Sequence, residues 1–156
     1  MKIKTLAALQ REIGKFKKEG RKIVFTNGCF DILHYGHAKY LQDAKNQGDI
    51  LVVAVNSDSS IRKIKGMGRP IVDEGNRLKL LSSLECVDYL VLFKERTPLE
   101  VIKKLRPDIL IKGADWNKSK IVGSDFVESY GGKVLTVKLV KGLSTTNLIK
   151  KIVKTR

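Results

Sequence analysis

The uninterrupted apolar run Ile50-Leu51-Val52-Val53-Ala54-Val55 is the feature that most restricts how this chain can fold. A strand with one face in water alternates apolar and polar residues, whereas a run without alternation is typical of a strand covered on both faces. Asn56-Ser57-Asp58 follows the run with polar side chains. The run therefore predicts a central strand of a parallel sheet that lies between two layers of helices.

Further apolar segments alternate along the chain with stretches that have apolar residues at helical spacing. The predicted strands are residues 22–25, 50–55, 87–93, 109–111 and 134–139. Thr5 is expected to cap a first helix, Thr97-Pro98-Leu99-Glu100 has the pattern of a capping box, and Ser144 is expected to cap the last helix. Residues 59–75, which contain three glycines and a proline among charged residues, are expected to form a mobile connection.

This order of elements predicts an α/β fold, a Rossmann-like three-layer α/β/α arrangement with a five-stranded, mostly parallel sheet. The 156 residues fit one domain, 1–156, with residues 1–20 as an N-terminal helix packed on it. Parallel sheets bind ligands at the carboxyl ends of their strands. Four segments should meet there: 27–37, 56–58, 112–116 and 142–146.

The first of these segments contains His34-Tyr35-Gly36-His37, with the only two histidines of the chain. They stand where a strand becomes a helix, and the free N–H groups and positive dipole end of a helix entrance favour anions, above all phosphates. Histidines three residues apart can also share a metal ion. Beyond Cys29 and Asp31, however, no further cluster of ligand-type residues accompanies them, so no dedicated metal site is predicted.

Two common nucleotide-binding patterns are absent. A phosphate-loop NTPase needs a glycine-rich run that ends in Gly-Lys-Ser or Gly-Lys-Thr, and a dinucleotide fold needs three spaced glycines at the first turn. Only Gly28 and Gly36 are available here. The prediction of a phosphate-binding site therefore depends on the histidine turn, residues 34–37.

The formal net charge is +15, from 31 Lys and Arg against 16 Asp and Glu. The basic residues are spread along the chain without interleaved aromatic side chains, so no nucleic-acid partner is predicted. A positive field would instead attract small anionic substrates. The sequence has no membrane-spanning stretch or cleavable leader, and its two cysteines form no pair, so a cytoplasmic protein with reduced thiols is expected.

The histidine turn resembles the signature of the nucleotidyltransferase superfamily, which includes cytidylyltransferases and pantetheine phosphate adenylyltransferase. The segments that extend this resemblance are Thr26-Asn27-Gly28-Cys29-Phe30-Asp31-Ile32-Leu33-His34, Val55-Asn56-Ser57-Asp58, Lys65-Gly66 with Arg69-Pro70, Lys112-Gly113-Ala114-Asp115 and Ser144-Thr145-Thr146-Asn147. Together, from about residue 20 to the end, they look like the adenylyltransferase half of the bacterial ADP-heptose synthases.

That resemblance implies transfer of AMP from ATP to D-glycero-D-manno-heptose 1-phosphate, which gives pyrophosphate and the ADP-heptose of the lipopolysaccharide inner core. Many relatives fuse this half to a sugar kinase, for which this chain has no room. A separate heptose kinase is therefore expected to supply the sugar 1-phosphate. A homodimer is also expected, as among relatives.

Two alternatives remain. Glycerol 3-phosphate cytidylyltransferases carry an arginine and a glutamate before the Gly-Ile-Ser-Thr segment, where this chain has Leu139 and Lys141, so the arginine is missing. The other alternative is a basic protein that binds RNA or a nucleotide without catalysis.

The candidate residues divide by expected role. His34, His37 and Lys65 are expected to be catalytic because they would stabilise charge on the triphosphate and the developing pyrophosphate. The expected nucleotide-binding residues are Asn27, Gly28, Cys29, Phe30, Gly36, His37, Lys112, Gly113, Asp115, Ser144, Thr145 and Thr146. The expected substrate-binding residues are Asp31, Asn56, Asp58 and Arg77; Asp31 and Asp58 have the alternatives of ordering a turn or pairing with Arg77. Trp116 is either a packing residue or a stacking surface.

Mg²⁺ is the expected cofactor, held mainly by nucleotide phosphates and water, since no carboxylate cage is evident.

Overall fold

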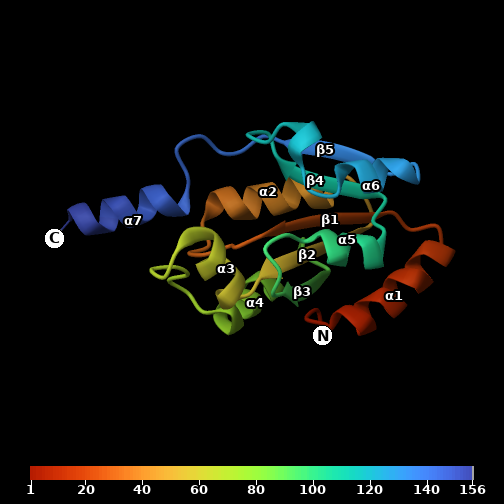
Figure 1. The fold of residues 1–156 in the computed structure, drawn as a ribbon, viewed down its shortest axis with the longest axis horizontal. Helices are drawn as coiled ribbons and strands as arrows, with labels where there is room; N and C mark the ends of the chain where they lie inside the picture. The colour runs from red at the N-terminus through yellow and green to blue at the C-terminus, as the bar shows by residue number, and fades with distance from the viewer. Residues whose placement is uncertain (156) are drawn as a thin grey trace.

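The computed structural model describes residues 1–155 as a three-layer α/β/α fold around one parallel sheet (Figure 1). The sheet has five strands in the order β3-β2-β1-β4-β5, and every pairing is parallel. The strands are β1 (Ile23–Gly28), β2 (Ile50–Asn56), β3 (Tyr89–Phe93), β4 (Ile109–Gly113) and β5 (Lys133–Val137). The predicted fold class is confirmed, and the sheet is parallel throughout.

Helices cover both faces of this sheet. They are α1 (Leu6–Lys18), α2 (Tyr35–Lys45), α3 (Asp58–Lys65), α4 (Glu74–Ser82), α5 (Leu99–Leu105), α6 (Ser124–Ser129) and α7 (Thr145–Lys154), with a 3-10 turn at Lys118–Lys120. Apolar residues of α1, α5 and α6 form one core layer, and those of α2 and α4 form the other. Along β2, Val52 and Ala54 pack in the first layer and Leu51 and Val53 in the second, which explains the uninterrupted apolar run.

The strand order creates a natural binding position. From β1 the chain proceeds outward to β2 and β3, then returns to the other side of β1 to form β4 and β5. The carboxyl ends of β1 and β4 therefore flank the topological switch point, the crevice where open α/β sheets bind ligands.

Two local predictions are wrong. Residues 58–65 form helix α3 and not a mobile connection: Ser57 caps it by accepting from the N–H of Ser60 at 3.2 Å, and Ile61 anchors it in the interior. Thr97 is not a helix cap, because α5 begins at Leu99 after Pro98 and has no side-chain cap bond. The caps of α1 by Thr5 and of α7 by Ser144 are confirmed.

Helix α7 differs from the others because none of its residues is buried. Figure 1 shows it at the C-terminal end of the chain, extended away from the sheet. None of the helices in residues 1–155 has the length and apolar character needed to cross a membrane.

Candidate functional site

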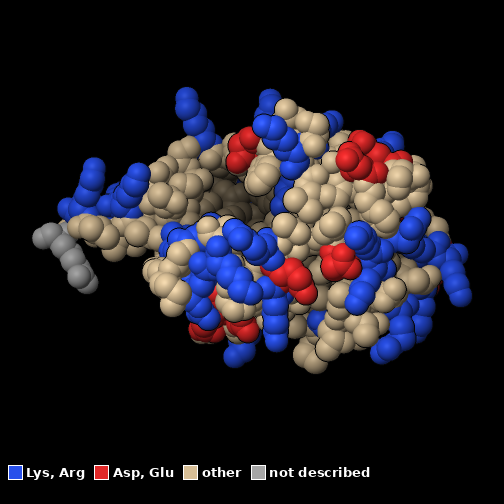
Figure 2. Space-filling view, viewed as in Figure 1, with Lys and Arg blue, Asp and Glu red and all other residues tan. Residues whose placement is uncertain are grey.

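A cavity of about 360 Å³ opens at the carboxyl ends of β1 and β4, at the switch point of the sheet. Figure 2 shows the hollow, with Lys and Arg side chains gathered on its rim. The lining residues are Asn27, Gly28, Cys29, Phe30, Asp31, His34, Gly36, His37, Tyr40, Lys65, Lys112, Gly113, Asp115, Trp116, Leu139, Val140, Leu143, Ser144, Thr145 and Thr146. Three of the four segments expected at this edge, together with Lys65, therefore meet in one cavity.

The two histidines stack against each other at the entrance of α2. Their ring centroids are 3.9 Å apart with an interplanar angle of 19°, and the ring of Phe30 meets His37 edge-on. His34 is the N-cap residue but makes no side-chain cap bond. A methyl group on Gly36 would lie 3.0 Å from the His34 ring, so glycine at this position lets the imidazole lie against the helix backbone.

Several buried polar atoms of this turn have no partner within the described part of the chain: Nδ1 and Nε2 of His34, Nδ1 of His37 and Oδ1 of Asn27. Buried polar atoms are normally hydrogen-bonded, so a cluster of unpartnered ones indicates groups that await a ligand. Burial lowers the pKa of His34. Burial, followed by the charges of His34 and Lys65, lowers the pKa of His37 to about 4, so both imidazoles are neutral near pH 7.

A second helix entrance faces the same cavity. Ser144 caps α7 by accepting from the N–H of Asn147 at 3.1 Å, and the Thr145 hydroxyl donates to the Asp31 carbonyl at 2.6 Å. The Thr145 hydroxyl is thus already used, which leaves the Ser144 and Thr146 hydroxyl donors and the first-turn N–H groups for a ligand. The positive ends of α2 and α7 together make an environment suited to a polyphosphate.

Lys112 and its neighbours form the wall at the end of β4. The Lys112 ammonium donates to the Asn27 carbonyl at 3.3 Å and lies 5.7 Å from the centre of the Trp116 ring. Burial lowers the pKa of Lys112 to about 8, against the opposing influence of Cys29 and Asp115. A methyl group on Gly113 would lie 2.6 Å from Oδ1 of Asp115 and 3.0 Å from the Leu139 side chain, so the wall is closely packed.

Asp31 borders the cavity, but its carboxylate is already engaged. It accepts from the N–H groups of Ile71 and Val72 at 2.9 to 3.1 Å and from Nε of Arg69 at 2.9 Å. Burial would raise the pKa of Asp31, but these donors outweigh it and hold the pKa below its usual value. Of the alternatives that the sequence left open, the structure therefore favours ordering of a backbone turn over direct contact with the sugar.

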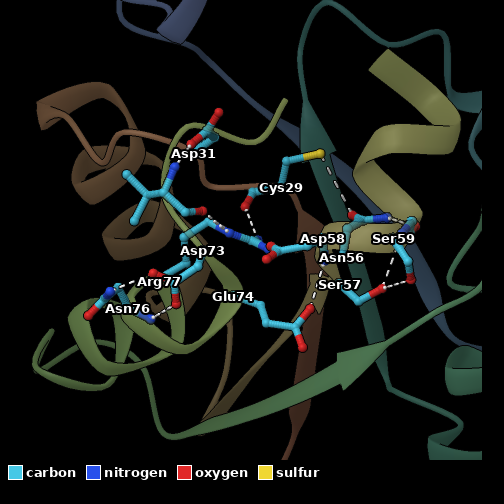
Figure 3. Close-up of polar contacts among 12 residues, drawn as sticks. Cys29, Asp31, Asn56, Ser57, Asp58, Ser59, Asp73, Glu74, Asn76 and Arg77 are labelled. Carbon is cyan, nitrogen blue, oxygen red and sulfur yellow. Dashed lines mark hydrogen bonds and ion pairs between the residues drawn. The ribbon is translucent and has the colours of Figure 1, made fainter. Parts of the chain in front are cut away.

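The other three expected substrate-binding residues, Asn56, Asp58 and Arg77, do not line the cavity, and Asp58 takes the alternative that the sequence left open, pairing with Arg77. Asn56 donates to Oγ of Ser60 at 3.0 Å, and Arg77 pairs with Asp58 at 2.7 Å. Figure 3 shows Arg77 with its partner Asp58, and Asn56 near them. Because α3 begins directly after β2, the polar groups at this strand end are used within the protein.

Three lining residues were not expected at this edge of the sheet: Tyr40, Leu139 and Val140. Tyr40 lies one turn beyond Gly36 and His37 on the same face of α2, and this spacing is the signal that points to it. Leu139 was expected to end the last strand, but β5 stops at Val137, so Leu139 and Val140 both lie beyond the strand and line the cavity.

The chemistry of the cavity suits an anion better than a metal ion. Its donors are imidazole, ammonium, hydroxyl and amide groups, and residues 1–155 contain no group of three or more His, Cys, Asp or Glu side chains that could hold a metal. Magnesium prefers several oxygen ligands, and the one buried carboxylate at the cavity is occupied. The lining residues by themselves do not fit a direct Mg²⁺ site.

A parallel Rossmann-like sheet with two histidines at its first strand-to-helix turn defines a class of nucleotide-handling proteins. Residues 25–155 match the model of the cytidylyltransferase-like family, and the chain belongs to this family. The expected place in the nucleotidyltransferase superfamily is confirmed.

The curated relatives are more specific. The chain is 54% identical over 153 residues to the bifunctional protein HldE of Geobacter metallireducens, and 52% identical over 151 residues to the bifunctional protein HldE of Syntrophotalea carbinolica. These matches cover 98% and 97% of this chain but 31% of each relative, so the chain spans about a third of their length. The resemblance to one part of a longer bifunctional protein is confirmed.

Solved structures agree with the fold. The lipopolysaccharide core biosynthesis protein from Thermoplasma volcanium is 36% identical with a TM-score of 0.64, over 78% of this chain and 98% of that one. A pantoate-beta-alanine ligase from Francisella tularensis is 16% identical with a TM-score of 0.66, over 99% of this chain and 79% of that one, a likeness in fold alone.

Proposed function

We propose that this chain transfers AMP from ATP to D-glycero-D-manno-heptose 1-phosphate and releases pyrophosphate. The observation that carries the proposal is the convergence of two unpartnered imidazoles with two helix entrances in one cavity. Such a site attracts a polyphosphate and stabilises negative charge. The identity of 50% or more to proteins named HldE supports the choice of a heptose phosphate as the acceptor.

In the proposed reaction, an oxygen of the sugar phosphate attacks the α-phosphorus of ATP in line with the departing pyrophosphate. The bond from the α-phosphorus to the bridging oxygen breaks as the new phosphorus–oxygen bond forms, so no protein nucleophile is required. His34 and His37 would donate hydrogen bonds to the phosphate oxygens, and Lys65 would balance charge from the rim. Residues 144–146 would bind the same phosphates through hydroxyl and N–H donors.

The base and the metal belong to the proposal as well. Adenine would lie against the wall of Lys112, Trp116 and Leu139. The arginine that the glycerol 3-phosphate cytidylyltransferases carry in this region is missing from the chain. Mg²⁺ would arrive with the nucleotide, bound to phosphate oxygens and water. A sugar kinase would supply the acceptor, the protein would act in the cytoplasm, and it would form a homodimer.

A pyrophosphate-release assay tests this function. Purified protein is mixed with Mg²⁺, each nucleoside triphosphate in turn, and either heptose 1-phosphate or glycerol 3-phosphate. We expect rapid release only with ATP and heptose 1-phosphate. A preference for CTP, or transfer to glycerol 3-phosphate, would refute the assignment, and tight salt-sensitive RNA binding without any pyrophosphate would favour a binding protein.

Replacing either histidine tests the site itself. We expect His34→Ala and His37→Ala to lower kcat at least about a hundredfold, the scale of losing one preorganised donor. Tyr35→Ala is the matched control, because Tyr35 stands on the same turn, is 64% exposed and does not line the cavity. Near-normal turnover by both histidine variants would remove them from the reaction.

A further inference from the structure

Two oppositely charged side chains are buried at the cavity: Asp31 at its border, with its carboxylate already bound, and Arg77 outside its lining. Asp31 is 1% exposed and Arg77 is 2% exposed. Burying a charge costs free energy unless hydrogen bonds and an opposite charge compensate it. The groups that hydrogen-bond to Asp31 and Arg77 therefore show which segments these two side chains hold in place.

Asp31 and Arg77 hold the same loop, the segment between α3 and α4, from opposite sides. They meet at Val72: its N–H donates to the Asp31 carboxylate at 2.9 Å, and its carbonyl accepts from Nε of Arg77 at 3.0 Å. Asp31 also binds Arg69 and the N–H of Ile71. The main chain of residues 71 and 72 and the side chain of Arg69 are thus held by two buried ionic groups.

The remaining nitrogens of Arg77 extend this frame in two directions. Nη1 donates to the Cys29 carbonyl at 2.6 Å, within the turn that lines the cavity, and Nη2 donates to Asp58 at 2.7 Å, in the first turn of α3. Figure 3 shows Arg77 between Cys29 and Asp58. One guanidinium therefore joins α3, the loop and the histidine turn into a single unit, a geometry that suits its planar fork of donors.

Lys65 is the side chain that this frame presents to the cavity. Among residues 58–77, all of which the structure describes, it alone lines the cavity. It stands at the last turn of α3, and its charge contributes to the lowered pKa of His37. Gly66, with φ of +93°, and Gly68 follow it, so the adjacent chain does little by itself to hold it in place.

We propose that Asp31 and Arg77 are positioning residues, a buried clamp that sets α3 and its Lys65 over the phosphate-binding turn. The clamp acts on the reaction through Lys65 and touches no substrate. This inference rests on the proposed function, because it assigns Lys65 to the transferred phosphates. Lysine in place of Arg77 keeps the charge but does not reproduce three directed contacts.

A double-mutant cycle separates this coupling from a general structural role. We expect Lys65→Ala and Arg77→Lys each to lower kcat about tenfold or more, since small misplacements of a charge-stabilising group are costly. In the Lys65→Ala background, Arg77→Lys should add no more than about a twofold loss. Lys63→Ala is the control, because Lys63 is an exposed lysine of the same helix that does not line the cavity. In the Lys63→Ala background, Arg77→Lys should lower kcat by the same factor as in the unmodified protein.

Amide hydrogen exchange without substrate supplies a readout that does not depend on turnover. Exchange at residues 66–72 should accelerate in Arg77→Lys and stay unchanged in Lys65→Ala. If Arg77→Lys does not fold, Asp58→Asn replaces it, since Asp58 is on the outer side of the frame with its side chain 21% exposed.

The outcomes are distinct. Three results would each overturn the clamp. The first is that Arg77→Lys lowers kcat by the same factor with and without Lys65→Ala. The others are normal turnover by Lys65→Ala and unchanged amide exchange at residues 66–72 in Arg77→Lys. Absence of nucleotidyl transfer by the unmodified protein with every acceptor would refute the proposed function, and the exchange pattern would still decide whether Arg77 holds the loop.

Discussion

At the scale of single residues, burial changes the chemistry of the side chains that face the cavity. Lys112 is the clearest case, because its ammonium has one backbone acceptor, the Asn27 carbonyl, and is otherwise enclosed. Enclosure disfavours the charged form and brings the pKa of Lys112 down to about 8. The lysine is therefore charged at neutral pH but loses its proton in mildly alkaline solution.

This titration makes nucleotide binding depend on pH. Below about pH 8 the ammonium is positive and attracts the nucleotide, and above it the neutral amine does not. We expect the affinity for ATP, measured by calorimetry, to fall about tenfold between pH 7 and pH 9, the scale of one charged hydrogen bond. Lys112→Met should bind weakly at both pH values.

The control for this prediction is Lys104→Met, which removes an exposed lysine of α5 that does not line the cavity. It should keep the pH dependence of the unmodified protein. Affinity that is constant from pH 7 to pH 9, or a Lys112→Met protein that retains the full alkaline loss, would contradict the assignment.

At the scale of elements, the sequence predicted the strands better than the connections. Apolar runs such as 50–55 identify buried strands because little else in a domain of this size needs six consecutive apolar residues. Helix α3 was not predicted because the glycines and proline of residues 66–70 indicated a loop for the whole of residues 59–75. Ser57, which caps the helix, and Ile61, which packs in the interior, are the residues that stabilise it. Strand order depends on contacts between distant segments, and the local pattern does not contain it.

In the candidate site, too, the local pattern predicted the segments that converge but not the partners of individual side chains. Residues 27–37, 112–116 and 142–146 were expected to converge, because the carboxyl ends of parallel strands meet at one edge, and they line the cavity together. Asp31 and Arg77 carry charges that suggest ligand contact in a sequence. Their partners Val72 and Cys29 are backbone groups, whose availability the sequence does not reveal.

At the scale of the whole molecule, α7 is the element whose apolar face lacks a cover within residues 1–155. Ile152 is 59% exposed and Val153 is 67% exposed, and a ten-residue helix is marginal in water without packing. In the proposed homodimer, a second copy would present exposed apolar residues of α3 and the following loop to this face: Ile64, Met67 and Ile71. Asp73 and Glu74 follow this loop in the sequence and would pair with the lysines of α7.

The proposed homodimer would bury these two surfaces against each other, so charge placed on the α7 face should dissociate it. We expect light scattering after gel filtration to give twice the 17.5 kDa chain mass for the unmodified protein and one chain mass for Ile152→Asp with Val153→Asp. Asn147→Asp adds a negative charge to an exposed residue of the same helix outside the apolar face, and it should remain dimeric. A monomeric unmodified protein at micromolar concentration would contradict the dimer, and a double variant that still dimerises would assign the contact to another surface.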